Sequence, residues 1–193
     1  MLTNKLKNPR LLGLWLFHIP SKLYSINNEE KEWVKTFPPK KGWQYHFSRG
    51  CARFALSELY GVPALEIPLI ASPGKAPQLA NGWGYISISH CKDALIIGWS
   101  SEPIGIDIER SDRNCQGEKI ANRYFCESEK EALKNLTEKE KCSDVLERWV
   151  VKEASIKWQQ DKISANLNQW EWQKSSSTAF HHSLKYKVSI YKA

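Results

Sequence analysis

The chain has 193 residues, of which 41% are hydrophobic, 11% aromatic and 25% charged, and this is the composition of a soluble globular protein. A chain of this length can bury a core and holds one ordinary domain or two small lobes. No apolar run is long enough to span a bilayer. The apolar run at 11–17 is short and lacks a small-residue cleavage site, so it predicts a first strand and not a signal peptide.

The formal net charge is +7. This charge indicates an anionic partner, which could be a nucleic acid, a membrane surface, a phosphorylated small molecule or an acidic protein. The basic residues are dispersed along the chain, and that distribution disfavours a dedicated nucleic-acid binder. The five cysteines form no CxxC pair and no Cys/His spacing suited to zinc, so they predict reduced thiols in a cytoplasmic protein.

The first half of the chain alternates between helical and extended patterns. Residues 27–41 predict a short helix followed by a loop at a proline pair. Apolar residues at helical spacing predict a helix over 47–60 that Gly61 ends. The prolines and glycines of 62–84 predict a loop, and the alternating stretch 85–100 predicts a hairpin.

The second half begins after Pro103, where the chain has its least connected point. Residues 104–109 predict a strand, and two helices are expected over 117–136 and 143–160. A last strand is predicted over 184–191. Helices and hairpins in this order indicate an α+β fold.

Two acids stand in the strand that follows Pro103. Residues two apart in a strand share a face, so Asp107 and Glu109 point together while Ile106 and Ile108 face the core. Paired carboxylates repel each other unless a cation or a proton lies between them, and hard oxygen ligands suit Mg²⁺. For this pair alone, however, two solvated acids on an exposed sheet face remain the better interpretation.

A second charged pair lies in the helix predicted over 143–160. Glu153 and Lys157 follow Trp149 at i+4 and i+8, next to the ridge that carries Leu146 and Ile156. Charges on a partly apolar face are costly unless they meet a partner such as a metal ion or a phosphate. The alternative is a surface ion pair worth about 0.2–0.5 kcal/mol.

A third group of polar residues lies at the end of the predicted hairpin strand. Ser89 and His90 end that strand, and Lys75 follows Gly74 in the preceding loop. Serine, histidine and lysine can together hold a phosphate, although a lone histidine at a turn is more often structural. There is no nucleophile elbow, so a Ser/His/Asp hydrolase is not indicated.

Taken in order, these segments resemble one family. Gly105–Glu109 reads Gly-Ile-Asp-Ile-Glu, and Trp149–Lys157 reads Trp-Val-Val-Lys-Glu-Ala-Ser-Ile-Lys. Together with Gly74-Lys75, Ile86–His90 and a first-lobe helix at Arg49–Tyr60, they resemble the Sfp-type 4'-phosphopantetheinyl transferases. Both signatures occur in order and at the separation usual in that family.

The resemblance implies an α+β fold of two similar, pseudo-symmetric lobes, with the active site in the cleft between them. It implies an amino-terminal lobe over 1–103 that binds coenzyme A. It also implies a carboxy-terminal lobe over 104–193 with the metal site and the catalytic helix. A cytoplasmic monomer is expected, without a membrane or nucleic-acid partner.

The activity implied by the resemblance is holo-[acyl-carrier-protein] synthase (EC 2.7.8.7). It moves 4'-phosphopantetheine from coenzyme A to a serine of an acidic apo acyl or peptidyl carrier protein, with Mg²⁺ as cofactor and adenosine 3',5'-bisphosphate as product. Fatty-acid, polyketide and peptide synthase carriers all remain open.

The family's functional residues map onto this sequence by position. The expected Mg²⁺ ligands are Asp107, Glu109 and Glu153. The expected catalytic residues are Glu153 as first choice of general base, Glu109 as second choice, and Lys157 at the pyrophosphate. The expected coenzyme A contacts are Arg49, Lys75, Ser89, His90 and Lys157.

Two other functions stay open from the sequence. A basic nucleic-acid-binding module without catalysis should show clustered cations, exposed aromatic residues and steeply salt-dependent binding. Another Mg²⁺-dependent phosphoryl-transfer enzyme or nuclease could use the same acids, but it should be indifferent to coenzyme A.

Overall fold

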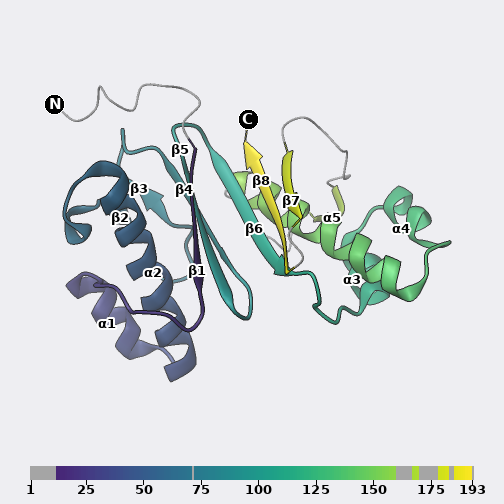
Figure 1. Cartoon of the computed structure of the whole chain (residues 1–193), viewed down its shortest axis with the longest axis horizontal. Helices are drawn as coiled ribbons and strands as arrows, with labels where there is room; N and C mark the ends of the chain where they lie inside the picture. Colours follow the sequence, from purple (N-terminus) through teal and green to yellow (C-terminus); the bar gives the residue numbers. More distant parts are fainter. Residues whose placement is uncertain (1–11, 71, 160–166, 170–177, 183–184, 193) are drawn as a thin grey trace. The chain divides into compact units, whose positions relative to one another are not determined.

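The computed structural model describes residues 12–70, 72–159, 167–169, 178–182 and 185–192. They form helices and small antiparallel sheets, so the α+β prediction is confirmed. No helix in these ranges is long and apolar enough to cross a membrane. The elements follow one another as β1 (Leu12–His18), α1 (Asn28–Thr36), α2 (Pro39–Tyr60), η1 (Ala64–Glu66), β2 (Leu69–Ile70), β3 (Gln78–Leu79), β4 (Tyr85–His90), β5 (Ala94–Ser100), β6 (Ile104–Arg110), α3 (Gly117–Tyr124), α4 (Glu127–Leu133), α5 (Glu138–Gln159), η2 (Leu167–Gln169), β7 (Thr178–His182) and β8 (Tyr186–Lys192) (Figure 1).

The contacts divide the chain into two compact units. The first unit comprises residues 1–88 and 93–103, and the second comprises residues 89–92 and 104–193. The tip of the β4–β5 hairpin therefore belongs with the second unit, although the strands on either side of it belong to the first. The functions expected of the two lobes stay predictions.

The first unit is built on a three-stranded sheet in the order β1-β5-β4, with β1 antiparallel to β5. Helix α2 covers this sheet and begins at Pro39, eight residues before the predicted start. The proline pair was expected to form a loop, but Pro39 occupies the first helical position, where its missing N–H costs no helical hydrogen bond. The helix ends as predicted at Gly61, whose φ of 67° is easily reached only by glycine.

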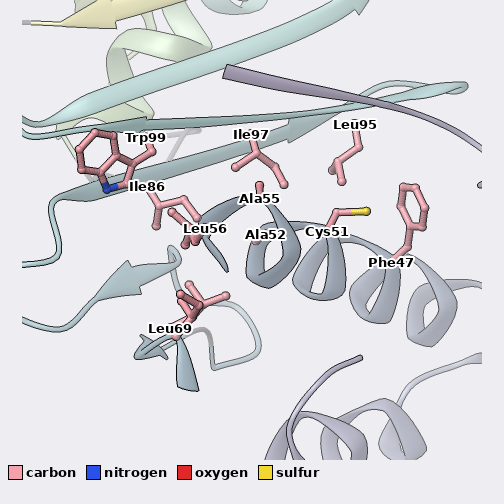
Figure 2. Packing of buried hydrophobic residues seen from close by; sticks show 11 residues of the cluster. Phe47, Cys51, Ala52, Ala55, Leu56, Leu69, Ile86, Leu95, Ile97 and Trp99 are labelled. Atoms are coloured by element: carbon pink, nitrogen blue, oxygen red, sulfur yellow. The ribbon is translucent and has the colours of Figure 1, made fainter. Parts of the chain in front are cut away.

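The core of the first unit lies between α2 and the sheet. Figure 2 shows the side chains of α2 and of β4 and β5 that meet there. The buried members are Phe47, Cys51, Ala52, Ala55, Leu56, Ile67, Leu69, Ile86, Leu95, Ile97 and Trp99. Their spacing in α2 is the helical repeat seen in the sequence, so this apolar stripe holds the helix on the sheet.

A buried ion pair joins α2 to α1 in this unit. Arg53 donates to both carboxylate oxygens of Glu30, at 2.8 and 3.1 Å, and the two side chains are 1% and 2% exposed. Glu30 also closes the capping box of α1, with Asn27 as the N-cap residue. Arg53 further donates to the carbonyl of Ile67. One arginine thereby ties α1, α2 and the segment after η1 together.

The second unit contains a sheet in the order β6-β8-β7, with both pairs antiparallel. The single helix predicted over 117–136 is wrong, because the structure has α3 and α4 separated at Phe125, whose backbone is extended. Glu129 closes a capping box on the Cys126 N–H and starts a new helix there. Helix α5 begins at Glu138, five residues earlier than predicted.

Helix α5 packs against β6 and β8. Lys152 lies on its buried side at 1% exposure, and its Nζ lies 2.8 Å from Glu129 Oε2 and donates to the carbonyl of Leu167, also at 2.8 Å. These contacts tie α4, α5 and η2 together.

The cysteines of the second unit correct one expectation. Cys115 and Cys142 form a disulfide, with Cα atoms 5.8 Å apart. The prediction that all five thiols are reduced is therefore wrong for this pair. The disulfide joins the segment before α3 to the first turns of α5. The two cysteines are 27 positions apart, so no local sequence pattern predicts that they pair.

Candidate functional site

The site in the second unit depends on an unusually close approach of α5 to β6. A Cβ placed on Gly105 would lie 1.8 Å from the carbonyl oxygen of Ala154 and 2.5 Å from the Trp158 N–H nitrogen. Only glycine at 105 therefore allows this approach, and the two signature segments of the sequence are in backbone contact. Side chains at 107 on the strand and at 153 and 157 on the helix are thereby brought within reach of one another.

Asp107 lies at the centre of the site and is 2% exposed. Its Oδ1 accepts from Lys157 Nζ at 2.6 Å and from the Ser89 hydroxyl at 2.5 Å. Lys157 also donates to Ser89 Oγ at 3.0 Å. A pair of solvated acids thus does not describe this strand, because Asp107 is buried and held by a cation and a hydroxyl.

The second oxygen of Asp107 is in a different situation. Asp107 Oδ2 is buried and accepts no hydrogen bond from the part of the chain that the structure describes. An unpaired buried carboxylate oxygen is costly, since burial removes its water without replacing it. This oxygen is therefore a point in the site where a cation would be bound favourably.

Glu153 projects from α5 beside Asp107. Burial and the charge of Asp107 raise the pKa of Glu153 to about 8, and the partial compensation by Lys157 does not cancel them. The Lys157 Nζ is 3.7 Å from Glu153 Oε2, farther than from Asp107. Near neutral pH this carboxyl group holds a proton unless another cation arrives.

Lys157 stays charged in this setting. Burial lowers its pKa, but Asp107 and Glu153 act in the opposite direction and leave the pKa above its ordinary value. A lysine held in this way is a fixed positive charge and not a base. Its ammonium forms the ion pair that neutralises Asp107.

Glu109 lies two residues along β6 from Asp107. Burial raises the pKa of Glu109, and Arg113 counteracts part of this effect. Arg113 Nη1 donates to Glu109 Oε1, so this carboxylate is engaged by a cation of its own. Sequence reasoning missed Arg113, because it follows the strand in a loop and belongs to neither signature.

His90 ends β4 next to Ser89. Surrounding protein atoms and the positive charge of Lys157 lower the pKa of His90, although the residue as a whole is exposed. The imidazole is therefore biased toward its neutral form, in which one nitrogen can accept and the other can donate. Ser89 and His90 belong to the same unit as the acids of β6, and their expected contacts with coenzyme A stay predictions.

Two residues expected at the site belong to the first unit. Arg49 lies on α2, with its guanidinium 4.9 Å from the ring centre of Tyr45. Lys75 is exposed and its N–H donates to the carbonyl of Ser72, in the turn that contains Gly74 with a φ of 77°. Their expected contacts with coenzyme A stay predictions.

The three carboxylates that were expected to bind the metal do not converge on one point. In the described ranges, no group of three or more His, Cys, Asp or Glu side chains is arranged so that it could hold a metal ion. Glu109 is turned to Arg113, and Asp107 and Glu153 share Lys157. Asp107 and Glu153 are two buried carboxyl groups with one lysine between them, so an added cation would stabilise their charged forms.

Comparison with known proteins gives two matches. Residues 103–191 match the family described as the 4'-phosphopantetheinyl transferase superfamily. The protein 4'-phosphopantetheinyl transferase ffp of Bacillus subtilis is 30% identical over 125 residues, which make up 65% of this chain and 49% of the relative. The match thus spans about half of that relative's length. Strand β6 and helix α5 both lie within the family match.

Proposed function

Because residues 103–191 match the 4'-phosphopantetheinyl transferase superfamily, we propose that the chain belongs to this superfamily and that it transfers 4'-phosphopantetheine from coenzyme A to a serine hydroxyl of an apo carrier protein. The observation that carries this proposal is the buried group Asp107, Glu153 and Lys157, in which a fixed cation and two carboxylates converge from the two signature segments. Phosphoryl transfer needs positioning and charge neutralisation more than any special covalent chemistry.

The residues present fit a magnesium ion. The orphaned Oδ2 of Asp107 and the neighbouring Glu153 offer the one or two carboxylates that Mg²⁺ takes from a protein. Glu109 is the proposed third ligand and would have to leave Arg113 to serve. When bound, Mg²⁺ neutralises charge on the phosphate oxygens of the substrate.

Glu153 is the proposed general base. A carboxyl group whose pKa is about 8 in the metal-free protein is close to the working pH, which is where a group can both accept and return a proton. It would take the proton of the carrier serine as the serine oxygen attacks the phosphorus nearer the pantetheine. Glu109 is the second choice for this role.

Lys157 is proposed to act on the leaving group. Its ammonium is held by Asp107 and cannot serve as a base, so it would bind the diphosphate of coenzyme A and stabilise the bisphosphate that departs. Ser89 and His90 are proposed to contact coenzyme A from the end of β4, and Arg49 and Lys75 to contact it from the first unit. The carrier is proposed to be acidic, in line with the net charge of +7.

The test is to incubate the protein with coenzyme A, Mg²⁺ and a panel of apo carriers from fatty-acid, polyketide and peptide synthases. Intact mass spectrometry should show a gain of one phosphopantetheine unit, about 340 Da, on at least one carrier, as expected for a single transfer of this group. The gain should disappear when the carrier serine is replaced by alanine.

The controls separate transfer from mere binding. Omitting coenzyme A should abolish the gain, and chelation of divalent ions should reduce it strongly. A protein that binds coenzyme A but loads no carrier of the panel would contradict the proposed function.

A further inference from the structure

Two buried oxygens on neighbouring strands have no hydrogen-bond partner in the part of the chain that the structure describes. One is Oδ2 of Asp107 on β6, and the other is the hydroxyl oxygen of Ser189 on β8. Asp107 is 2% exposed and Ser189 is 0% exposed. Burial removes water from such an atom without replacing it, so two of them in one sheet need an explanation.

The register of the sheet sets these two residues opposite each other. Asp107 is the direct partner of Ser189 in the antiparallel pair of β6 and β8. Directly opposite residues of such a pair project to the same face, with Cβ atoms about 4.5–5.5 Å apart. A hydroxyl and a carboxylate oxygen can span this gap with one hydrogen bond of about 2.5–3.0 Å.

The neighbours of Ser189 in β8 identify this face of the sheet. Lys187 donates to a backbone carbonyl of α5 at 2.8 Å, and the ring centre of Tyr191 lies 5.0 Å from that of Trp158 in α5. Residues two apart in a strand share a face, so Ser189 points toward α5 as Lys187 and Tyr191 do. This is the face on which Asp107 meets the lysine of α5.

The side-chain hydrogen bonds of Asp107 within the described ranges all go to one oxygen. Lys157 and Ser89 both donate to Oδ1. The two oxygens of a carboxylate are equivalent acceptors, and an ammonium group carries three donors. A separate donor on Oδ2 makes the two oxygens distinct, so that Lys157 stays on Oδ1.

On the basis of the proposed function, we propose that Ser189 is a positioning residue, whose hydroxyl donates to Asp107 Oδ2 and orients this oxygen for Mg²⁺. Rotation about the Cα–Cβ bond of Ser189 moves the hydroxyl among three staggered positions and brings it to Oδ2. A carboxylate oxygen has two lone pairs, so Oδ2 accepts this hydrogen bond and offers the other lone pair to the metal. Hydrogen bonds to a ligating carboxylate fix its orientation and tune its affinity for the metal.

The alternative is that residue 189 only has to be small. Gly105 on the same face of the sheet allows the backbone of α5 to come very close, and a serine can serve there as a filler. The two interpretations differ in whether the hydroxyl matters. Variants that change the hydroxyl at nearly constant size therefore separate them.

The hydroxyl is tested by calorimetric titration of the metal-free protein with Mg²⁺ alone. Ser189→Ala should bind Mg²⁺ about 10- to 100-fold more weakly than the wild-type protein, the loss usual when a group that orients a metal ligand is removed. Ser189→Thr keeps a hydroxyl and should bind within about threefold of the wild-type affinity.

Ser155→Ala is the matched control in the same unit. Ser155 is 3% exposed, and its hydroxyl donates to the carbonyl of Val151 within α5. Its loss removes a buried hydroxyl that serves the helix backbone and not a carboxylate. The control should change Mg²⁺ affinity less than about twofold, because it orients no proposed ligand.

Equal Mg²⁺ affinities of the wild-type and Ser189→Ala proteins would overturn the role of Ser189. So would an equally large loss in Ser189→Ala and Ser189→Thr when both unfold at the wild-type temperature, since the hydroxyl would then be irrelevant. A wild-type protein that binds no Mg²⁺ would overturn both this role and the proposed metal site.

Carrier loading separates positioning of the metal ligand from a part in the chemical step. Loading by Ser189→Ala should be slow at limiting Mg²⁺ and reach the wild-type rate at saturating Mg²⁺, because only binding of the metal is weakened. A rate that stays low at saturating Mg²⁺ would contradict a positioning role. If the wild-type protein binds Mg²⁺ more tightly than Ser189→Ala but loads no carrier, the proposed function fails and the positioning of Asp107 stands.

Discussion

The long helices of the two units share one stabilising device. Helices α2 and α5 each have 22 residues, and each carries a buried cation, Arg53 in the first and Lys152 in the second. Each cation pairs with a glutamate that closes the capping box of a shorter preceding helix, Glu30 of α1 and Glu129 of α4. Each also donates to a carbonyl beyond the end of its own helix. The predicted likeness of the two lobes as whole folds stays a prediction.

The two helices differ in the residues that come after the buried cation. In α2, the buried residues other than Arg53 are glycine or apolar. In α5, Glu153 comes directly after Lys152 and Lys157 one turn later, and both face the buried Asp107 of β6. The first arrangement satisfies its charges within one ion pair, whereas the second places two acids around a single lysine. We infer that the paired cation belongs to the scaffold and the unsatisfied acids to the chemistry.

The largest effect is expected for Glu153→Gln. The transfer rate should fall about 10²- to 10⁴-fold, the usual contribution of a general base. The melting temperature of the metal-free protein should not fall, because glutamine removes a carboxyl group that burial and Asp107 destabilise when it is charged. Carrier loading and thermal unfolding measure the two effects. Unchanged loading would assign the base to Glu109 or exclude this site.

The next largest effect is expected on the stability of the protein when the buried cation of either long helix is removed. Lys152→Met and Arg53→Met each leave a buried glutamate without its cation and should each lower the free energy of unfolding by about 3–5 kcal/mol. Denaturant titration measures both. A large loss for Arg53→Met with none for Lys152→Met would show that the two helices do not share this device, since Lys152 would then not be a scaffold residue.

A smaller effect is expected at the close approach of α5 to β6. Gly105→Ala should destabilise the protein by about 3 kcal/mol or slightly more, because the new methyl group meets backbone atoms that cannot turn away. Gly117→Ala is the matched control in the same unit, where the nearest atoms lie at ordinary distances of 3.6 to 3.9 Å. The control should be neutral or slightly stabilising. Equal unfolding midpoints for the two variants would contradict the packing described for Gly105.

The last prediction concerns the pH dependence of stability. The pKa of Glu153 is about 8 in the folded protein and 4.5 ordinarily, so the folded state binds this proton more tightly than the unfolded state. The resulting stabilisation is complete below the ordinary pKa and is lost as the pH rises through the folded pKa. The melting temperature of metal-free protein should therefore fall across this window, and less in Glu153→Gln. Identical profiles would contradict the raised pKa.

The sequence predicts the elements better than their boundaries. Periodicity located β1, the β4–β5 hairpin, β6 and the helix that carries Glu153. The start of α2 was placed too late because Pro39 was counted as a helix breaker, although it stands at the one helical position that suits it. The break between α3 and α4 was missed because it depends on the side chain of Glu129, which bonds to a backbone N–H that periodicity does not reveal.

The site was predicted from spacing and from the resemblance, and the structure adds contacts that neither contains. The stripe of Glu153 and Lys157 follows from helical geometry, and so does the burial of Leu146 and Ile156 beside it. The pairing of Arg113 with Glu109 and of Lys152 with Glu129 depends on loops and on the packing of separate helices. No local pattern signals such contacts, because their partners become neighbours only after folding.

The acids of the second unit are proposed to form a reaction site and not a second stabilising ion pair. The decisive measurement is the rate at which folded wild-type and Asp107→Asn proteins load the same apo carrier with coenzyme A and Mg²⁺. We expect Asp107→Asn to be at least about 100-fold slower, because it loses the charge that orients Lys157 and a proposed metal ligand. Loading at the wild-type rate by Asp107→Asn would contradict the proposed reaction site and leave Asp107 with a structural role like that of Glu30 in the first unit.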